Sequence, residues 1–250
     1  MNTPMISPNI VVCDSGADAA RYVADLLASA IRSQPEMILG LATGGTPIDV
    51  YRELIRQHHE ADLDCSRVTS FNLDEYVGLP SDHPQSYRYF MQQHLFDDAG
   101  FSSANTHVPD GMAADLDQYA KQYEQLISQS GGIDLQLLGI GHNGHIAFNE
   151  PGSAMESRTR VVELAEETIN ANSRFFESTD EVPRRAITMG IGTILEARKI
   201  VLMATGESKA VAIANALDGV CDPGNPASAL QRHVNVVVVL DPPAASRLGS

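Results

Sequence analysis

Residues 140–151 bring an imidazole, an amide and a carboxylate together in a loop that glycines interrupt. His145 and Glu150 are five residues apart, which is too far for facing positions on a regular helix but within reach across a tight turn. A carboxylate bonded to one ring nitrogen fixes the tautomer of an imidazole and favours its charged form, so the other nitrogen can exchange a proton with a substrate. The loop therefore predicts an acid–base histidine, His145, with Glu150 as its partner and Asn143 beside them. A structural histidine that caps the loop is the alternative.

A metal site is a second alternative for this loop, because His142 and His145 lie close together in the sequence. Zinc sites are built from several His, Cys or carboxylate ligands, and no cysteine or third ligand lies at a suitable spacing from this pair. We therefore expect no metal here.

Residues 43–47, Thr-Gly-Gly-Thr-Pro, form a turn between an apolar run and an amphipathic one. Thr43, Gly44, Gly45 and Thr46 offer free backbone N–H groups, hydroxyls and close backbone approach at the positive end of a helix dipole. Thr46 is expected to cap the helix, with Pro47 at its first position. The turn lacks the spacing of a nucleotide P-loop and of a GxGxxG fingerprint. It predicts a general anion site, with a plain strand-to-helix turn as the alternative.

Two neighbouring carboxylates, Asp74 and Glu75, directly follow a predicted strand. Adjacent carboxylates on a loop are usually solvated, but here Phe71, Leu73 and Tyr76 surround them with apolar and aromatic surface. Partial removal from water raises the pKa of a carboxyl group toward that of a useful general base. Asp74 is the better candidate for this base, and the sequence does not rank it far above Glu75.

Arg174 and Lys209 are the cations to consider as partners of an anionic ligand. Lys209 begins a predicted helix just after a strand and a loop that contains Gly206. This arrangement brings a lysine to the same sheet edge as Thr43, because the carboxyl ends of parallel strands meet at one edge. A solvated surface charge is the alternative for both side chains.

The elements that must hold these groups alternate between apolar runs and amphipathic segments. Strands are expected at residues 9–13, 37–42, 68–72, 133–139, 200–204 and 234–240. Helices are expected at residues 20–31, 47–55, 85–94, 115–130, 184–197 and 207–217. Such alternation predicts an α/β fold, a three-layer α/β/α sandwich whose mostly parallel, Rossmann-like sheet carries helices on both faces.

The chain has 250 residues, 43% of them hydrophobic, which is enough to bury one substantial core. We expect one domain over residues 1–250, with a short, poorly structured tail from about residue 241. The 17 Lys and Arg against 32 Asp and Glu give a net charge of −15, so no nucleic-acid partner and no anionic membrane surface are expected. An anionic small-molecule ligand is compatible with this charge, provided that local cations and N–H donors outweigh the repulsion by the net negative charge.

Three cysteines, Cys13, Cys65 and Cys221, are too few and too widely spaced for a disulfide framework and suit a reducing compartment. The first eight residues lack the basic-then-apolar order of a signal peptide, and no apolar run has the length of a membrane span. A cytoplasmic protein is expected.

Taken together, three motifs resemble the glucosamine-6-phosphate deaminase family, and the chain is similar to its short form. They are Leu-Ala-Thr-Gly-Gly-Thr-Pro at 41–47, Phe-Asn-Leu-Asp-Glu-Tyr-Val-Gly-Leu at 71–79 with His-Pro-Gln-Ser-Tyr at 83–87, and the loop 141–151 followed by Ser-Arg-Thr-Arg at 157–160. The resemblance runs in order over nearly the whole chain. It implies a cofactor-free isomerisation of an aldose to a ketose with loss of ammonia, which turns glucosamine 6-phosphate and water into fructose 6-phosphate.

The resemblance also implies a role for each candidate residue. Asp74 matches the base that moves the proton between C2 and C1 of the sugar. His145 matches the acid that opens the pyranose ring, and Glu150 matches the partner of that histidine. The positions at which the family holds the substrate phosphate are Thr43, Gly44, Gly45, Thr46, Arg174 and Lys209.

Two departures from the family pattern matter. Some members have Asp where this chain has Asn143, and a neutral amide cannot stabilise a charged ring, so Glu150 must supply that charge while Asn143 positions the ring. The longer, hexameric and allosterically activated members carry a basic residue where this chain has Val162, and an extended C-terminal region. We therefore expect activation by N-acetylglucosamine 6-phosphate to be absent or weak. The oligomeric state is left open, and a homo-oligomer is allowed.

Three other functions compete with this one. A relative that acts on another hexosamine phosphate, such as the galactosamine epimer, is the nearest enzyme, because the sequence does not show which groups read the C4 hydroxyl. 6-Phosphogluconolactonase shares the fold, but the segment 72–76 is not expected in such a hydrolase. A non-catalytic sugar-phosphate sensor is disfavoured, because the sequence shows no helix-turn-helix module or basic patch and keeps Asp74, His145 and Glu150.

Overall fold

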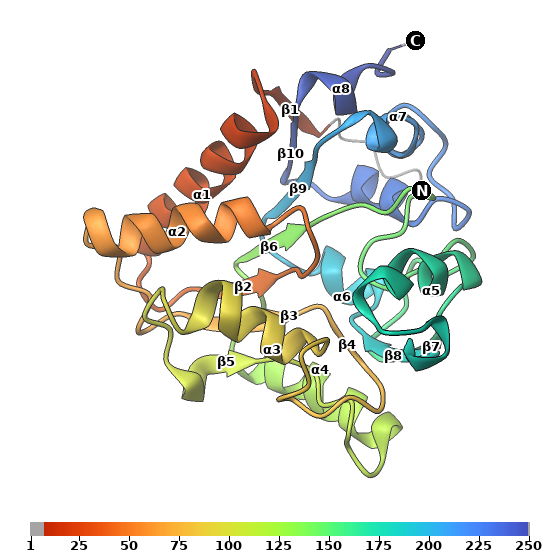
Figure 1. The fold of residues 1–250 in the computed structure, drawn as a ribbon. Helices are drawn as coiled ribbons and strands as arrows, with labels where there is room; N and C mark the ends of the chain where they lie inside the picture. Colours follow the sequence, from red (N-terminus) through yellow and green to blue (C-terminus); the bar gives the residue numbers. More distant parts are fainter. Residues whose placement is uncertain (1–7, 250) are drawn as a thin grey trace.

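Seven parallel strands form the central sheet of this computed structural model, which describes residues 8–249 (Figure 1). Their order across the sheet is β1-β10-β9-β6-β2-β3-β5, and every pair of neighbours runs parallel. The strands are β1 (Asn9–Val12), β2 (Ile38–Leu41), β3 (Thr69–Asn72), β5 (Thr106–His107), β6 (Leu135–Leu138), β9 (Ile200–Ala204) and β10 (Val236–Leu240). Helices supply most of the crossovers that parallel strands need. The predicted three-layer α/β/α sandwich is confirmed.

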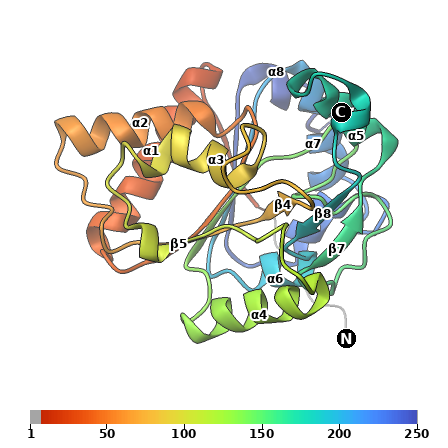
Figure 2. The same cartoon turned by 60° about the horizontal axis from the view of Figure 1, so that its bottom comes forward.

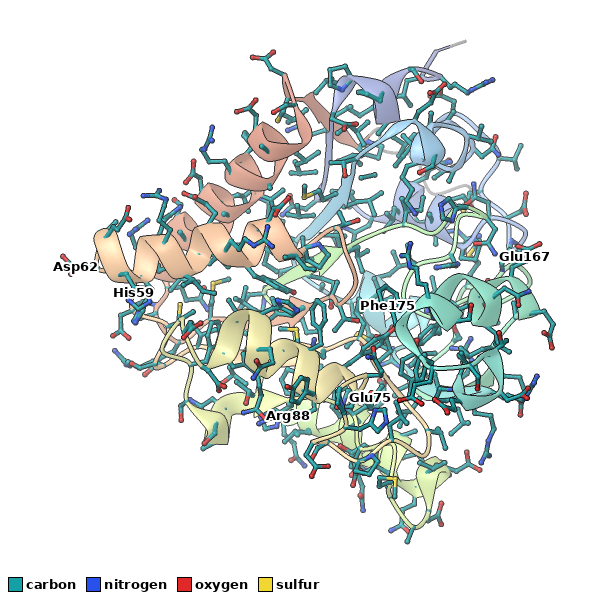
Figure 3. All side chains as sticks on the ribbon, viewed as in Figure 1. His59, Asp62, Glu75, Arg88, Glu167 and Phe175 are labelled. Atoms are coloured by element: carbon teal, nitrogen blue, oxygen red, sulfur yellow. The ribbon has the colours of Figure 1, made fainter. Side chains whose placement is uncertain are left out.

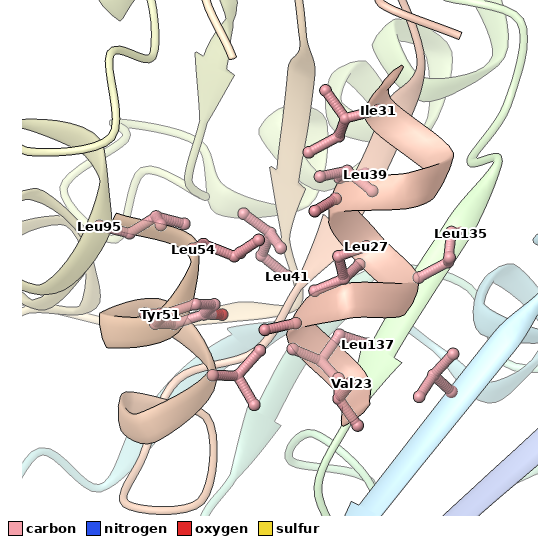
Figure 4. Close-up of a cluster of buried hydrophobic side chains, with 14 of the residues drawn as sticks. Val23, Leu27, Ile31, Leu39, Leu41, Tyr51, Leu54, Leu95, Leu135 and Leu137 are labelled. Atoms are coloured by element: carbon pink, nitrogen blue, oxygen red, sulfur yellow. The ribbon is translucent and has the colours of Figure 1, made fainter. Parts of the chain in front are cut away.

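One face of the sheet is covered by α1 (Gly16–Ser33), α2 (Ile48–Glu60) and a helical segment made of α3 (Tyr87–Met91) and the π-helical turn η1 (Gln92–Phe96). Apolar side chains fill the space beneath them, as Figure 4 shows for Val23, Leu27, Ile31, Leu39, Leu41, Tyr51, Leu54, Leu95, Leu135 and Leu137. The helical spacing of the apolar residues in α1 explains why one side of this helix is buried.

The opposite face is covered by α4 (Leu116–Gln129), α6 (Ile191–Leu195), α7 (Ala210–Leu217) and the 3-10 helix η6 (Pro226–Arg232). Strand β9 shows why its sequence is continuously apolar. Val201 and Met203 pack into the core under α1 and α2, whereas Ile200 and Leu202 pack into the opposite core. A strand buried on both faces has no polar side to present.

Shorter elements complete the described chain. They are α5 (Glu166–Asn172), α8 (Pro242–Ala245) and the 3-10 turns η2 (Ser103–Asn105), η3 (Ser173–Phe175), η4 (Thr179–Glu181) and η5 (Glu207–Lys209). No helix within residues 8–249 is both long enough and apolar enough to cross a membrane.

A second, antiparallel sheet of order β4-β8-β7 lies beside the central one, between α4 and α5 (Figures 1 and 2). Its strands are β4 (Asp74–Tyr76), β8 (Arg185–Thr188) and β7 (Arg160–Glu163). The predicted helix over residues 184–197 is therefore wrong in its first half. Residues 185–188 pair with both neighbouring strands. Gly190 lies so close to the backbone of Ser157 that a Cβ there would meet the Ser157 carbonyl oxygen at 2.1 Å, and only Ile191–Leu195 is helical.

Two further expectations about helix ends are wrong. Helix α2 begins at Ile48, and Pro47 occupies the cap position without any side-chain cap, so Thr46 does not cap it. The tail expected from residue 241 instead contains α8. Asp241 caps this helix by accepting the N–H of Ala244 at 2.9 Å, and the same carboxylate accepts the N–H of Gly206 at 2.9 and 3.0 Å. Ala244 is fully buried in the core.

Candidate active site

A cleft of about 260 Å³ opens where β2, β3, β6 and β9 end, at the carboxyl edge of the central sheet. Parallel α/β sheets present ligands at this edge. Nine of the ten predicted site residues line the cleft: Thr43, Gly44, Gly45, Thr46, Asp74, Asn143, His145, Arg174 and Lys209. The tenth, Glu150, lies behind His145. The structure thus brings together residues from both halves of the sequence.

The loop after β6 holds His145 against Glu150. The His145 Nδ1 atom lies 3.5 Å from Glu150 Oε2, which is an ion-pair contact rather than a hydrogen bond, and Nδ1 has no hydrogen-bond partner among the described residues. Asn143 donates from Nδ2 to Glu150 Oε2 at 2.8 Å and accepts the backbone N–H of His145 at 3.2 Å. Asn143 therefore holds the carboxylate and the backbone, whereas we expected it to position the ring.

Glu150 is ionised by its surroundings. Burial by itself raises the pKa of this carboxyl group, but contacts with His145, Thr168 and Asn143 outweigh burial and lower it to about 2. Hydrogen bonds to the charged form of a carboxylate favour that form. Glu150 therefore carries a full negative charge beside His145 at neutral pH.

Glycines give the loop its tight course around His145. The backbone of Gly141 lies against the imidazole, so a Cβ added there would come within 2.2 Å of ring atom Cε1. Gly144 has a φ of +85°, a left-handed conformation that favours glycine. Ala147, which lines the cleft, has a φ of +52°. Any larger residue at Gly141 would displace the ring.

Asp74 lies in β4, paired with Thr188 of β8, and its side chain reaches the cleft. Asp74 is 6% exposed, and its carboxyl group has no hydrogen-bond or ion-pair partner among residues 8–249. Burial, and secondarily the charge of Glu75, raises its pKa from the ordinary 3.8 to about 8. A buried carboxyl group without a partner and with a pKa near neutrality is suited to accept and return a proton.

Glu75 points away from the cleft because successive residues of a strand face opposite sides. Its carboxylate accepts the backbone N–H groups of Tyr76, Tyr87 and Arg88, each at 2.9 Å. Figure 3 shows Glu75 beside Arg88 near the start of α3. Burial raises the pKa of Glu75 to about 7 although these donors oppose the shift. The structure thereby separates the two carboxylates that the sequence could not rank: Asp74 faces the cleft and Glu75 anchors α3.

The turn after β2 and the residue that precedes α7 also line the cleft. Gly44 has a φ of +98°, and a Cβ at Gly44 or Gly45 would meet nothing within 4 Å, so a ligand can approach this backbone closely. Lys209 comes from the opposite side, directly before α7. Burial and the neighbouring charge of Arg174 lower the pKa of Lys209.

These cations lack partners of opposite charge. Within residues 8–249, the side chains of Lys209 and Arg174 form no hydrogen bond or ion pair, and the guanidinium carbon of Arg174 lies 4.7 Å from the centre of the Phe175 ring. The charge of Lys209, then burial, then His145 and Arg174 lower the pKa of His142, which also lines the cleft. Two cations that no carboxylate neutralises, in a chain of net charge −15, favour an anionic ligand.

Several lining residues were not singled out from the sequence. Tyr87 comes from α3, whereas Thr168 and Asn172 come from α5. Tyr87 ends the motif at residues 83–87, which could have pointed to it. No local signal marks Thr168 and Asn172, because their proximity to the loop at 140–151 depends on how the second sheet folds. Among the described residues, no three His, Cys, Asp or Glu side chains gather as metal ligands would.

Known proteins share both the sequence and the fold. The family model for glucosamine-6-phosphate isomerases and 6-phosphogluconolactonase matches residues 14–239. A glucosamine-6-phosphate deaminase of Rhodopirellula baltica is 55% identical over 238 residues, which span 95% of this chain and 94% of the relative. A solved monomeric glucosamine-6-phosphate deaminase has a TM-score of 0.94 at 45% identity, over 96% of this chain and 99% of its own. A 6-phosphogluconolactonase from Trypanosoma cruzi has a TM-score of 0.78 at 23% identity, over 99% and 100%, which is a likeness of fold.

Proposed function

Because the chain belongs to the family of glucosamine-6-phosphate isomerases and 6-phosphogluconolactonases, as its motifs predicted, we propose that it is a glucosamine-6-phosphate deaminase. The reaction converts glucosamine 6-phosphate and water into fructose 6-phosphate and ammonia. One observation carries the proposal: the unpartnered carboxyl group of Asp74 shares a cleft with the His145–Glu150 pair and with the unpaired cations Lys209 and Arg174. A proton-transfer enzyme that acts on an anionic sugar needs these three parts.

The phosphate is the first group to be placed. In our proposal the backbone N–H groups of residues 43–46 and the side chains of Lys209 and Arg174 bind the phosphate dianion. The positive end of α2 adds to the attraction. Lys209 and Arg174 repel each other, and this repulsion adds to burial in lowering the pKa of Lys209. The dianion removes this repulsion, so binding is strongest for a doubly charged ligand.

His145 acts next, on the closed form of the sugar. The charged ring donates a proton to the pyranose oxygen as the bond between C1 and this oxygen breaks. The ring then takes the proton of the C1 hydroxyl, and the open-chain aldehyde results. Glu150, ionised because its pKa is about 2, stabilises the charged imidazole from 3.5 Å. Asn143 keeps the carboxylate oriented toward the ring through its 2.8 Å hydrogen bond.

Asp74 carries out the isomerisation. Its carboxylate removes the proton from C2 of the open-chain sugar and returns it to C1. A second proton passes from the amino nitrogen to O1, so that C1 carries a hydroxyl and C2 an imine. Water adds to this imine, and ammonia leaves. The raised pKa of Asp74, about 8, makes its carboxylate a stronger base than a solvated aspartate and brings it close to the working pH, where a general base is most effective. None of these steps requires a cofactor, and we propose that none is used.

An ammonia-release assay tests the function. The purified protein is given glucosamine 6-phosphate, galactosamine 6-phosphate and unphosphorylated glucosamine in parallel, with and without a chelator. We expect turnover of the first substrate, weak or no turnover of the others and no effect of the chelator. Preference for the galactosamine epimer would assign a different hexosamine phosphate. Tight binding of a sugar phosphate without ammonia release would instead indicate a sensor.

A further inference from the structure

Helix α5 contacts the acid pair through one side chain that the proposed chemistry leaves unused. Thr168 is 7% exposed, and its hydroxyl donates to Glu150 Oε1 at 2.5 Å. The other oxygen of the same carboxylate, Oε2, accepts from Asn143 and faces His145. Both oxygens of Glu150 are therefore held, one by its own loop and one by a separate helix.

The same helix leads directly to a cation of the cleft. Helix α5 ends at Asn172, and η3 continues it with Ser173, Arg174 and Phe175. In Figure 3 this segment lies between the labelled side chains of Glu167 and Phe175. Within residues 8–249 the Arg174 guanidinium packs on the neighbouring Phe175 ring and forms no hydrogen bond or ion pair, so it is available to a ligand.

We propose that Thr168 is a positioning residue that couples ligand binding at Arg174 to the orientation of Glu150 beside His145. The proposal rests on the function proposed above. A phosphate held by Arg174 fixes the α5–η3 segment against the loop at 140–151. Thr168 then keeps the Glu150 carboxylate in the rotation that directs Oε2 toward the imidazole. Without this bond the terminal torsion of a glutamate has a broad, shallow preference, and Oε2 is held by Asn143 alone.

A second hydrogen bond supports the role of α5. Asn172 lies four residues after Thr168, which places the two side chains on the same side of a helix. Its Nδ2 donates to the hydroxyl of Tyr76 at 2.8 Å, and Tyr76 belongs to β4, the strand that carries Asp74. The segment that ends in Arg174 therefore contacts the acid pair and the strand of the base at once.

Three variants test the role of Thr168. Thr168→Val keeps the shape of the side chain and removes the hydroxyl, whereas Thr168→Ser keeps the hydroxyl. We expect kcat for glucosamine 6-phosphate to fall roughly tenfold or more in Thr168→Val, the factor typical of one lost hydrogen bond to a charged group, and to be largely retained in Thr168→Ser. Thr193→Val is the matched control, because Thr193 donates to Glu124 at 2.6 Å away from the cleft. It should lower stability and leave kcat unchanged.

A double-mutant cycle tests the coupling to Arg174. Arg174→Ala should raise KM and lower kcat, and adding Thr168→Val to it should lower kcat much less than the same change does in the wild type. If the two effects on kcat simply multiply, or if Thr168→Val has the kcat of the wild type, the proposal is wrong.

A measurement without substrate separates this proposal from the proposed function. In the wild-type protein, carboxyl-detected NMR should give a depressed pKa for Glu150, and Thr168→Val should raise that pKa, because one hydrogen bond to the carboxylate is lost. No ammonia release by the wild type would refute the proposed function. An active wild type whose Glu150 pKa and kcat are unaffected by Thr168→Val would refute only the positioning role.

Discussion

At the scale of the residue, Asp74 and Glu75 are neighbours in the sequence, yet their carboxyl groups have different surroundings. Both carboxyl groups are buried, yet Glu75 accepts three backbone N–H groups and Asp74 accepts none. The alternation of a strand sends them to opposite sides. The sequence could predict that this spot is desolvated, but not which carboxylate faces the cleft, because that depends on the pairing of β4 with β8.

Asp74→Asn should abolish turnover while binding survives. The amide has nearly the same shape as the carboxyl group but cannot accept the C2 proton. We expect kcat to fall to the background rate, while calorimetric titration with fructose 6-phosphate gives a Kd close to that of the wild type. Glu75→Gln is the comparison variant, whose main effect should be on stability. An Asp74→Asn enzyme with near-normal activity would contradict the assignment of the base.

The same variant should change the pH dependence of stability. The pKa of Asp74 is raised from 3.8 unfolded to about 8 folded. Between these values the folded protein keeps a proton that the unfolded chain has lost, so this group makes the free energy of unfolding fall as pH rises through the window. Asn does not titrate. The Tm of Asp74→Asn relative to the wild type should therefore increase from pH 5 to pH 8 in thermal scans, and a constant difference would argue against the raised pKa.

Lys209→Ala should weaken substrate binding without weakening the fold. A lost charge-assisted contact to phosphate is worth roughly 1.5–3 kcal/mol, or roughly 10- to 150-fold in KM. Because Lys209 and Arg174 repel each other in the free protein, the Tm should not drop. Steady-state kinetics beside Lys121→Ala, an exposed lysine on α4, gives the comparison. Equal KM values in both variants would show that Lys209 does not bind the phosphate and is an ordinary surface charge.

At the scale of the element, the loop at 140–151 and the second sheet build the site together. Six predicted strands recur in the structure as parallel strands of the central sheet, because buried apolar runs are a strong local signal. Strands β4, β5, β7 and β8 were not foreseen. Each is short and pairs with a segment distant in the chain, and such pairing can override the helical spacing that residues 184–197 have locally.

Gly141→Ala should damage catalysis far more than folding. The added Cβ would overlap the imidazole of His145, with Cε1 at 2.2 Å, so the ring must rotate away from Glu150. We expect kcat to drop by roughly a hundredfold, about the contribution of one general acid, with KM for glucosamine 6-phosphate nearly unchanged. Gly139→Ala, where a Cβ meets nothing within 4 Å, is the neighbouring control. A wild-type kcat in Gly141→Ala would show that the ring orientation is not needed.

At the scale of the whole molecule, a strongly acidic chain keeps a small basic centre. From the net charge of −15 we predicted that the protein has no polyanionic partner. In so acidic a chain, Lys209 and Arg174 also became candidates for binding an anionic ligand. The set of site residues was therefore largely predictable, since chemistry at the ends of buried strands leaves a local pattern. The contribution of α5 was not predictable. Thr168 and Asn172 show no such pattern in the sequence, and only the packing of α5 places them at the site.

The rate should depend hyperbolically on substrate concentration. The resemblance led us to expect a basic residue at position 162 only in activated members, and Val162 of this chain packs against the apolar cluster around Tyr76 and Phe148. An aliphatic side chain offers no charge for an anionic effector. Initial rates measured with and without N-acetylglucosamine 6-phosphate should superimpose. Sigmoidal curves that this compound makes hyperbolic would show that activation survives without the basic residue.

The double role of Asp241 connects α8 to the proposed phosphate site. One carboxylate holds the N–H of Gly206, at the entrance to η5 and Lys209, and also the first turn of α8. Deleting the residues after Leu240, or replacing them with a tag, would remove Asp241 and these hydrogen bonds. The sheet would keep all its strands, yet the lysine would lose the backbone anchor that aims it. Affinity for the sugar phosphate would then decline, and the core would also lose the buried side chain of Ala244.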